Sequence, residues 1–297
     1  MTKAINADML AQNIKQEITN IITLTKQIAT IERNPKLAII TATDNKASHK
    51  YVANEITTAK EYGINAIKIE FDSSVTTEEL EAEIERLNND STVDGIILQL
   101  PIYDHLDSDY LLNIIDFDKD VNGLTLMSKA FLENDELNYL PCTAAGIILL
   151  LESVGIRNSD LTGKNVVIIG RSKTSGAPIS VAFRHLDTNV TTLHSKTKPE
   201  DLEFFVRNAD IVISCVGKRY LLKADWFKED SIVMGVSFQY DESGKQHLDF
   251  EVDKVIELGK AAFVTQRTNC TGKATVISLM YNTALSYARL LKDQENE

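Results

Sequence analysis

The chain has 297 residues, of which 43% are hydrophobic and 25% are charged, and its formal net charge at pH 7 is −12. The length allows about two domains, and the composition is that of a soluble globular protein with a sizeable core. The acidic balance argues against a broad nucleic-acid surface, because phosphate binding requires clustered Lys and Arg, but it leaves room for a local cationic pocket.

The sequence shows no signal for a membrane or an oxidising compartment. Cys142, Cys215 and Cys270 are odd in number and far apart, which argues against a disulfide framework. Residues 1–10 lack the pattern of a signal peptide, and the longest apolar stretch, 144–151, is too short for a bilayer, which needs about 20 residues. The histidines show no metal-ligand spacing. We therefore expect a cytoplasmic protein without metal or membrane contact.

Apolar periodicity in the first half predicts helices that alternate with strands. Apolar residues at helical spacing indicate one long amphipathic helix, and the run Leu37–Thr41 after Pro35 indicates a buried strand. Buried strands that alternate with helices imply a parallel sheet. The predicted elements are helices at 10–28, 46–62 and 76–89 and strands at 37–41, 66–71 and 94–99.

The second half repeats this alternation after a boundary that we place near Pro141. Val166–Ile169 is a predicted strand that runs into Gly170, and Pro178 suits the first turn of a helix near 177–186. The final helix carries a broad apolar stripe, which requires a partner surface. Further elements are predicted as strands at 189–193, 210–214, 231–236 and 261–264 and a helix at 274–292.

A glycine turn after the strand at 166–169 is the first functional signal. Gly176 follows Gly170 by six residues, so the segment is not the strict GxGxxG fingerprint. A small turn residue nevertheless lets the backbone approach a ligand, and the next helix presents free N–H groups to an anion. The alternative interpretation, a plain strand-to-helix turn, stays open on these residues alone.

The end of the next strand predicts which dinucleotide would bind. In a doubly wound sheet this position faces the adenosine ribose, where NAD-binding proteins usually carry an acid. Here Ser195 and Lys196 follow the strand, and Arg171 lies in the neighbouring loop. Donors without an acid favour a 2′-phosphate, so the residues predict NADP over NAD, although NAD binding and a merely solvated strand end are also compatible.

Short motifs occur in a fixed order along nearly the whole chain. They are Ser48-x-x-Tyr51-Val52, Gly95–Pro101, Lys119–Gly123, Pro141-Cys142-Thr143, Gly170-Arg171-Ser172, Gly176-x-Pro178, His194-Ser195-x-Thr197, Ala209–Ile213 and Asn282-Thr283. In this order and spacing the sequence resembles the bifunctional methylenetetrahydrofolate dehydrogenase/cyclohydrolase family. The resemblance implies two α/β domains flanking a cleft. The second would be a Rossmann-like doubly wound parallel sheet.

This resemblance also implies a domain assignment and an activity. Residues 1–140 plus 270–297 would form the folate side, and residues 141–269 would form the NAD(P)-binding domain of a cytosolic homodimer. Family members oxidise 5,10-methylenetetrahydrofolate to the methenyl compound with NADP and then hydrolyse that compound to 10-formyltetrahydrofolate. The expected partner is therefore a small folate-type substrate.

Site residues follow from the same resemblance. Tyr51 would pack on or hydrogen-bond the folate, and Gln99 would orient the catalytic group beside it. The position of Asn122 would contact the pterin ring. On the cofactor side, the resemblance assigns Gly170, Arg171 and Ser172 to the phosphate and ribose, Ser195 to the 2′-phosphate and the backbone of Phe238 to the nicotinamide end.

The sequence departs from the family on the folate side. The family motif Tyr-Val-x-x-Lys supplies the main catalytic lysine, and Glu55 stands at that position, on the same helix face as Tyr51. Lys60 lies more than one turn away and is a poor substitute. Asn122 replaces an aspartate. In the C-terminal loop 266–275, most of the family prolines and glycines are absent, which changes the permitted backbone dihedrals.

These departures predict a split in activity. Hydride transfer is mostly a positioning task, and an ionised Glu55 would favour the resulting cation. Hydrolysis requires water activation and proton movement, which the family lysine supports, so we expect the dehydrogenase to persist and the cyclohydrolase to be weak or lost. Three alternatives remain: an NAD(P)-dependent enzyme for another pterin or imine, a non-catalytic dinucleotide- or protein-binding relative, or a bifunctional enzyme that uses Glu55. An interpretation without any catalytic role, in which Glu55 is simply a solvated helix residue, also stays open.

Overall fold

The computed structural model describes residues 1–135 and 139–295, with side chains up to residue 289. The chain divides into two compact units. We call them the six-stranded unit, which contains Met1–Ala11 and Thr143–Thr275, and the three-stranded unit, which contains Gln12–Cys142 and Val276–Glu297. Each unit has its own sheet and its own buried core, so each is described by itself.

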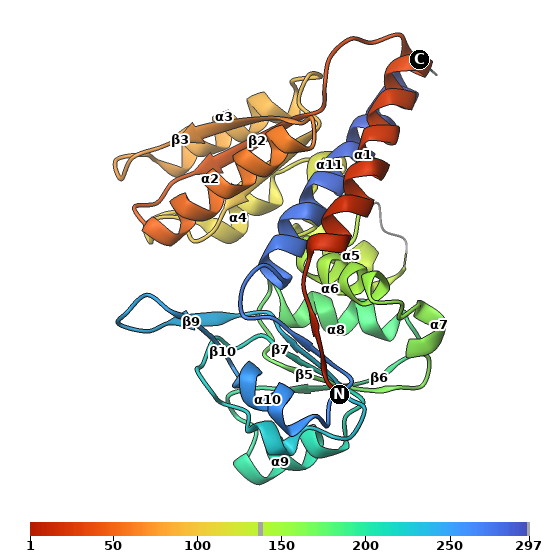
Figure 1. Cartoon of the computed structure of the whole chain (residues 1–297). Coiled ribbons are helices and arrows are strands. Elements are labelled where there is room, and N and C mark those ends of the chain that lie inside the picture. Colours follow the sequence, from red (N-terminus) through yellow and green to blue (C-terminus); the bar gives the residue numbers. More distant parts are fainter. Residues whose placement is uncertain (136–138, 296–297) are drawn as a thin grey trace. The chain divides into compact units, whose positions relative to one another are not determined.

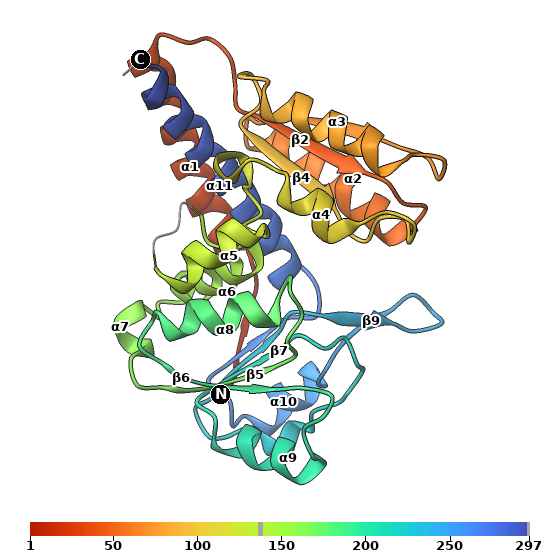
Figure 2. The same cartoon turned by 180° about the vertical axis from the view of Figure 1, so that it is seen from behind.

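The three-stranded unit is built on a short parallel sheet. In chain order it contains most of α1 (Asp8–Ala29), β2 (Lys36–Thr41), α2 (Lys46–Glu61), β3 (Asn65–Glu70), α3 (Thr77–Asn88), β4 (Gly95–Gln99), α4 (Ser108–Asn113), a 3-10 turn (Phe117–Lys119), α5 (Leu126–Glu133) and most of α11 (Thr271–Glu295). The strand order is β3-β2-β4; β3 and β2 are labelled in Figure 1, and β2 and β4 in Figure 2. Side chains alternate along the central strand, so Ala38 and Ile40 share one face. They pack there with Leu80 and Ile84 of α3.

Capping residues mark the start of two of these helices. The side-chain oxygen of Asn45 accepts hydrogen bonds from the backbone N–H groups of Ala47 and Ser48, at 2.9 and 3.2 Å, and so caps α2. Thr76 and Glu79 form a capping box at the start of α3, with bonds of 3.2 and 2.9 Å. The caps satisfy N–H groups that a helix start leaves without partners.

The six-stranded unit is a doubly wound parallel sheet. In chain order it contains β1 (Lys3–Ile5), α6 (Cys142–Ser153), α7 (Asn158–Leu161), β5 (Asn165–Ile169), α8 (Gly176–Arg184), β6 (Asn189–Leu193), α9 (Pro199–Asn208), β7 (Ile211–Ser214), a 3-10 turn (Ala224–Trp226), β8 (Ile232–Gly235), β9 (Phe238–Tyr240), β10 (Gln246–Leu248), α10 (Val252–Leu258) and β11 (Phe263–Thr265). The sheet order is β1-β11-β8-β7-β5-β6, and every pairing is parallel.

Helices cover both faces of this sheet. Helix α8 lies on one face, and α9 and α10 lie on the other (Figures 1 and 2). The chain passes from β5 to β6 and then returns across β5 to β7, so the winding direction reverses between β5 and β7. In open α/β sheets ligands bind outside the carboxyl ends of the strands at such a switch point. The loops after β5 and β7 are therefore the first place to search for a ligand site.

The termini of the chain differ from the assignment that the sequence implied. Residues 1–11 were expected with the first half, but Lys3–Ile5 pairs in parallel with Phe263–Thr265 of the six-stranded unit. Within the last helix, only the residues from Val276 onward belong to the three-stranded unit. Only Ile5 of this strand is buried, so the segment has no apolar run that would have indicated β1.

Polar side chains of α11 anchor it in the three-stranded unit. The amide Nδ2 of Asn282 donates to the carbonyl oxygens of Val121 and Leu140, at 2.9 and 3.0 Å. The hydroxyl of Tyr287 donates to the carbonyl of Arg33 at 2.9 Å.

None of the helices in the described ranges combines the length and the apolar character that a bilayer span requires.

Candidate active site

The turn after β5 brings two stretches of backbone unusually close together. Gly170 has a φ of +112°, a conformation that side-chain-bearing residues rarely adopt. A Cβ at this position would lie 2.9 Å from the carbonyl oxygen of Cys215, which follows β7. The N–H of Gly170 donates to the carbonyl of Leu193 at 2.8 Å. The turn thus joins the ends of β5, β6 and β7, and only glycine fits it.

Helix α8 begins directly behind this turn. A Cβ at Gly176 would overlap the carbonyl oxygen of Gly170, so the start of the helix packs against the turn without any side chain between them. The hydroxyls of Ser172 and Ser175 lie 2.5 Å apart. No side chain caps α8, and its first turn carries no acid, so its positive end is open to an anionic ligand.

The end of β6 carries donors and a cationic side chain. Ser195 and Lys196 are exposed, and the residues from His194 to Lys198 include no acid. The loop is shaped by local bonds, since the N–H of His194 donates to Thr197 Oγ1 at 2.9 Å. The sequence predicted NADP from this pattern. The open helix end and the acid-free strand end together fit a dinucleotide with a pyrophosphate and a 2′-phosphate.

Phe238 lies on the first strand of a hairpin beside the same sheet. Strands β9 and β10 pair antiparallel, and the Phe238 side chain is exposed and packs edge-on against Tyr240, with ring centroids 5.3 Å apart. A Cβ at Gly217 would lie 3.4 Å from the carbonyl oxygen of Phe238. The backbone of Phe238, rather than its ring, therefore borders the loop after β7.

Glu55 lies on the inner face of α2 in the three-stranded unit. This face also carries Ser48, Val52 and Ala59, and the exposed fraction of Glu55 is only 3%. Within the described residues, its Oε2 atom has no hydrogen-bond partner. Burial raises the pKa of the carboxyl from 4.5 to about 8. The solvated-helix alternative is therefore wrong, and at neutral pH the group is mainly a neutral acid rather than the anion that the sequence analysis considered.

Tyr51 and Cys142 lie close enough to Glu55 to interact with it electrostatically. Burial raises the pKa of the Tyr51 hydroxyl, and the neighbouring Glu55 and Cys142 raise it further. Burial also raises the pKa of the Cys142 thiol, with smaller contributions from Asp120 and Glu55. We call Tyr51, Glu55 and Cys142 the Glu55 cluster. All three groups are uncharged near pH 7, and Lys60 is exposed on the outer side of α2.

Gln99 and Asn122 have other neighbours in the structure. Gln99 ends β4, and its Nε2 atom donates to the carbonyl of the adjacent Leu100 at 2.9 Å. Across the described ranges no hydrogen bond joins Gln99 to Tyr51 or Glu55. The backbone carbonyl of Asn122 accepts from the N–H of Cys142 at 3.4 Å, which places this loop beside the Glu55 cluster. The roles of both side chains toward a substrate stay predictions.

Lys119 and Asp120 are structural residues. Lys119 is buried, and its ammonium group donates to the carbonyl oxygens of Leu87, Asn88 and Asp90 at 2.9, 2.7 and 2.8 Å. These carbonyls lie at and just after the end of α3, and the ammonium group gives each of them a charged donor. The buried carboxylate of Asp120 accepts from the N–H groups of Gly123 and Thr125 and from the hydroxyl of Ser128 in α5, and so fixes the turn that contains Asn122. The ammonium group of Lys119 is therefore engaged in holding the fold.

The divergent loop 266–275 keeps a defined backbone by different means. Asn269 has a φ of +54°, a left-handed conformation that asparagine tolerates better than most residues. Its Nδ2 atom donates to Asp8 at 2.9 Å, and Lys273 pairs with the same carboxylate at 3.1 Å. Thr271 Oγ1 donates to the carbonyl of Gly235 at 2.8 Å. Polar contacts thus hold the backbone of this loop.

Two residues of the site were not given roles by the sequence. The thiol of Cys142 lies next to Glu55 and donates to the carbonyl of Val121 at 3.2 Å. Asn282 binds the same carbonyl, and its Nδ2 atom lies 3.5 Å from the Cys142 sulfur. For Asn282 the sequence does contain a signal, because an amide side chain within the apolar stripe of the last helix requires a buried polar partner.

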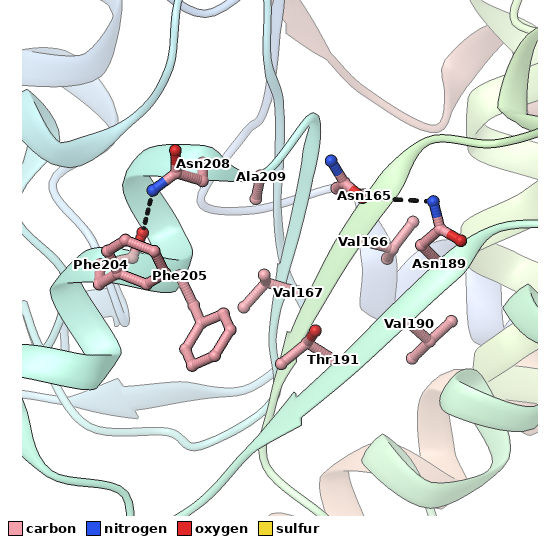
Figure 3. Close-up of a pocket in the computed structure, with 10 residues that line it drawn as sticks. All are labelled: Asn165, Val166, Val167, Asn189, Val190, Thr191, Phe204, Phe205, Asn208 and Ala209. Atoms are coloured by element: carbon pink, nitrogen blue, oxygen red, sulfur yellow. Dashed lines mark hydrogen bonds between the residues drawn. The ribbon is translucent and has the colours of Figure 1, made fainter.

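A hollow of about 500 Å³ lies elsewhere on the six-stranded unit, between α9 and the beginnings of β5 and β6 (Figure 3). It is at the opposite ends of these strands from Gly170. Its asparagine side chains are already engaged: Asn189 donates to Asn165 at 3.3 Å, and Asn208 donates to the carbonyl of Phe204 at 2.7 Å. The hollow is therefore separate from the dinucleotide turn.

The fold and the glycine turn define a protein with two α/β units, one of which is built to hold a dinucleotide. Residues 5–122 match the catalytic domain of the tetrahydrofolate dehydrogenase/cyclohydrolase family, and residues 141–291 match the NAD(P)-binding domain of that family. The chain belongs to this family. The family resemblance and the fold class predicted from the sequence are thereby confirmed, and the chain is an NAD(P)-dependent enzyme of the dehydrogenase/cyclohydrolase type.

Individual relatives match over nearly their whole length. The bifunctional protein FolD of Delftia acidovorans is 35% identical over 279 residues, which are 94% of this chain and 95% of that protein. The solved structure of the bifunctional FolD enzyme from Campylobacter jejuni has a TM-score of 0.89 and 32% identity, and the match covers 99% of this chain and 100% of that one. The FolD structure from Trypanosoma brucei, solved with NADP and an inhibitor, has a TM-score of 0.89 and 30% identity and covers 97% and 98%.

Proposed function

We propose that this enzyme oxidises 5,10-methylenetetrahydrofolate to 5,10-methenyltetrahydrofolate with NADP, and that its hydrolysis of the methenyl compound to 10-formyltetrahydrofolate is weak or absent. Family membership and the relatives named as dehydrogenase/cyclohydrolases support the first part. The second part depends on one observation, the buried and mainly neutral carboxyl of Glu55 at the position that the resemblance gives to the catalytic lysine.

NADP supplies a hydride acceptor when it is bound. Gly170 and the start of α8 would hold its pyrophosphate, because the turn admits backbone contact and the helix end attracts an anion. Arg171 and Ser172 would add donors, and Ser195 would hydrogen-bond the 2′-phosphate. The complex of the Trypanosoma brucei relative with NADP supports this choice of cofactor. The backbone of Phe238 would border the nicotinamide end.

The Glu55 cluster suits the oxidation step. Removal of a hydride leaves a delocalised cation on the substrate, and an ammonium group beside it would be repelled. The neutral carboxyl of Glu55 causes no such repulsion, and it becomes an attractive carboxylate if the cation lowers its pKa. Tyr51 offers an uncharged hydroxyl on the same helix face. Gln99 and Asn122 would orient the pterin through amide groups.

The same carboxyl is poorly suited to hydrolysis. A general base must be deprotonated before it can accept a proton from water, and at pH 7 a group with a pKa of about 8 is mostly protonated. Among the described residues no cation stands in the Glu55 cluster. Any residual hydrolysis by this route should therefore increase as the pH passes through about 8.

The two half-reactions can be followed separately. Purified enzyme would be mixed with methylenetetrahydrofolate and NADP to record NADPH absorbance, and with methenyltetrahydrofolate alone to record its decay. We expect NADPH formation, with methenyl decay near the uncatalysed rate. Glu55→Lys should accelerate the decay, whereas Glu61→Lys, which adds the same charge at an exposed position of α2, should not. Efficient methenyl hydrolysis by the unmodified enzyme would contradict the proposed split.

Divergence of the loop 266–275 keeps one alternative open, an enzyme of the same fold for another pterin or imine. NADP binding without any NADPH formation from methylenetetrahydrofolate would favour it. Thermal shifts with NADP and NAD, each with and without tetrahydrofolate compounds, would also report the cofactor preference. The homodimer and the cytoplasmic location stay predictions, and light scattering of the purified enzyme would measure the former.

A further inference from the structure

The carboxylate of Asp249 is buried in the six-stranded unit and organises the loop that follows β7. Its exposed fraction is 0%. Oδ2 accepts a hydrogen bond from the hydroxyl of Ser214 at 2.5 Å and another from the N–H of Val216 at 3.0 Å. Oδ1 accepts from the N–H of Lys218 at 2.6 Å. One side chain therefore holds the loop at three points within five residues.

All three donors to Asp249 are neutral groups. Among the described residues no ion pair involves Asp249, so its charge is balanced only by one hydroxyl and two backbone N–H groups that point at it. Hydrogen bonds to an ionised acceptor are stronger than those between neutral groups, and they fix the donors in direction as well as in distance. The conformation of the loop 214–218 is thus tied to the presence of this carboxylate.

This loop borders the dinucleotide turn. The N–H of Cys215 donates to the carbonyl of Ile169, the last residue of β5, at 2.7 Å. The carbonyl of Cys215 is the atom that a Cβ at Gly170 would meet at 2.9 Å. The side chain of Val216 is 43% exposed, although its N–H is bound to the buried carboxylate. The loop is therefore held from inside while its outer face lies at the switch point between β5 and β7.

The bonds made by the Asp249 side chain are separate from those that hold its backbone, which directly follows β10. Its backbone carbonyl accepts from the N–H of Leu222 at 2.9 Å, and the neighbouring residue Leu248 pairs with Phe238 in the hairpin. These backbone contacts do not need a carboxylate. The side chain can therefore be changed while these backbone contacts stay in place.

We propose that Asp249 is a positioning residue for the cofactor: its carboxylate holds the loop 214–218 in the arrangement that receives NADP at the β5/β7 switch point. Asp249 does not contact the cofactor in this proposal. It acts by directing the backbone of Val216 and Lys218, so that the dinucleotide meets a preformed loop and does not have to order it. This role concerns NADP alone and does not depend on which substrate is oxidised.

The test is the dissociation constant of NADP, measured by calorimetry on the full-length enzyme without a folate compound. In Asp249→Asn, the amide NH₂ would face one of the three donors, and a loop N–H would lose its acceptor. We expect binding to weaken about tenfold or more, the effect of one unpaired buried donor. Hydrogen exchange of the amides at 215–218 should become faster in the same variant.

Asp210→Asn is the matched control. Asp210 precedes β7 at its other end, where it accepts from the N–H of Asn165 at 2.9 Å and binds Lys228. This variant should lower the melting temperature and leave the NADP dissociation constant unchanged. If Asp249→Asn behaves in the same way, the proposal is overturned. If Asp249→Asn does not fold, Ser214→Ala decides, because it removes one of the three bonds: about threefold weaker binding is expected, and unchanged binding refutes the role.

Discussion

Replacement of Glu55 by glutamine tests whether the carboxyl is neutral in the folded enzyme. Glutamine has nearly the shape of a protonated glutamate but cannot ionise. Because burial raises the pKa of the folded-state carboxyl, the folded protein binds the proton more tightly than the unfolded chain does. Below about pH 4.5 both states are protonated, and Glu55 imposes no ionisation cost. Between pH 4.5 and about 8 the unfolded chain ionises first, so the enzyme loses stability that the glutamine variant keeps.

The size of the effect follows from the shift. One pKa unit corresponds to about 1.36 kcal/mol, so a change from 4.5 to about 8 amounts to about 5 kcal/mol at alkaline pH. About 3 kcal/mol of this is reached at pH 7. Tyr51 and Cys142 face the same carboxyl and have raised pKa values, so neither ionises within this window. The expected advantage of Glu55→Gln therefore grows with pH from about 4.5 to about 8 and is constant above that range.

Urea unfolding of both proteins at several pH values between 4.5 and 9 would measure this difference, because two-state extrapolation gives the free energy of unfolding at each pH. Glu61→Gln is the control, since Glu61 is exposed at the end of the same helix and its replacement should give profiles parallel to those of the unmodified enzyme. If the Glu55→Gln profile also runs parallel from pH 5 to 9, Glu55 ionises freely, and the physical basis of the predicted loss of hydrolysis fails.

Three further changes probe the two units. Gly170→Ala should destabilise the protein by about 1–3 kcal/mol and weaken NADP binding, because alanine is strained at a φ of +112° and its Cβ would meet Cys215; urea unfolding and calorimetry measure the two effects. Ser195→Asp should shift the preference from NADP toward NAD by about tenfold, since an added acid repels a 2′-phosphate; the ratio of the two dissociation constants reports it. Lys119→Met should cost about 3 kcal/mol in urea unfolding, because one buried and two partly buried carbonyls lose a charged donor.

Each of these changes has an outcome that contradicts its reasoning. Unchanged NADP affinity in Gly170→Ala would mean that the glycine turn is only a structural feature. An unaltered cofactor ratio in Ser195→Asp would remove the end of β6 from the cofactor site. Lys119→Met should leave NADP binding intact, because Lys119 belongs to the three-stranded unit, and a selective loss of affinity would show that its role is more than structural.

Helices and strands with regular apolar spacing could be predicted from the sequence, because contacts between neighbours in the chain determine them. The strand predicted at 189–193 has these bounds in the structure, and the helix predicted at 46–62 occupies Lys46–Glu61. Both have apolar spacing or capping residues of their own. The strand Lys3–Ile5 and the hairpin of β9 and β10 were not predicted. Lys3–Ile5 has only one buried residue and exists through pairing with a distant segment, and Phe238–Tyr240 is exposed along its whole length, so no buried face marks it.

The sequence by itself determined the alternation of helices and strands, the glycine turn at 170–176, the acid-free end of β6 and the presence of an acid at position 55. Only the tertiary structure decided that this acid is buried and mainly neutral, that Cys142 lies beside it, and that Asp249 holds the loop after β7. The reason is physical. Periodicity and turn chemistry act between neighbours in the chain, whereas the charge state of a carboxyl depends on the solvent and donors that remain around it after distant segments have packed.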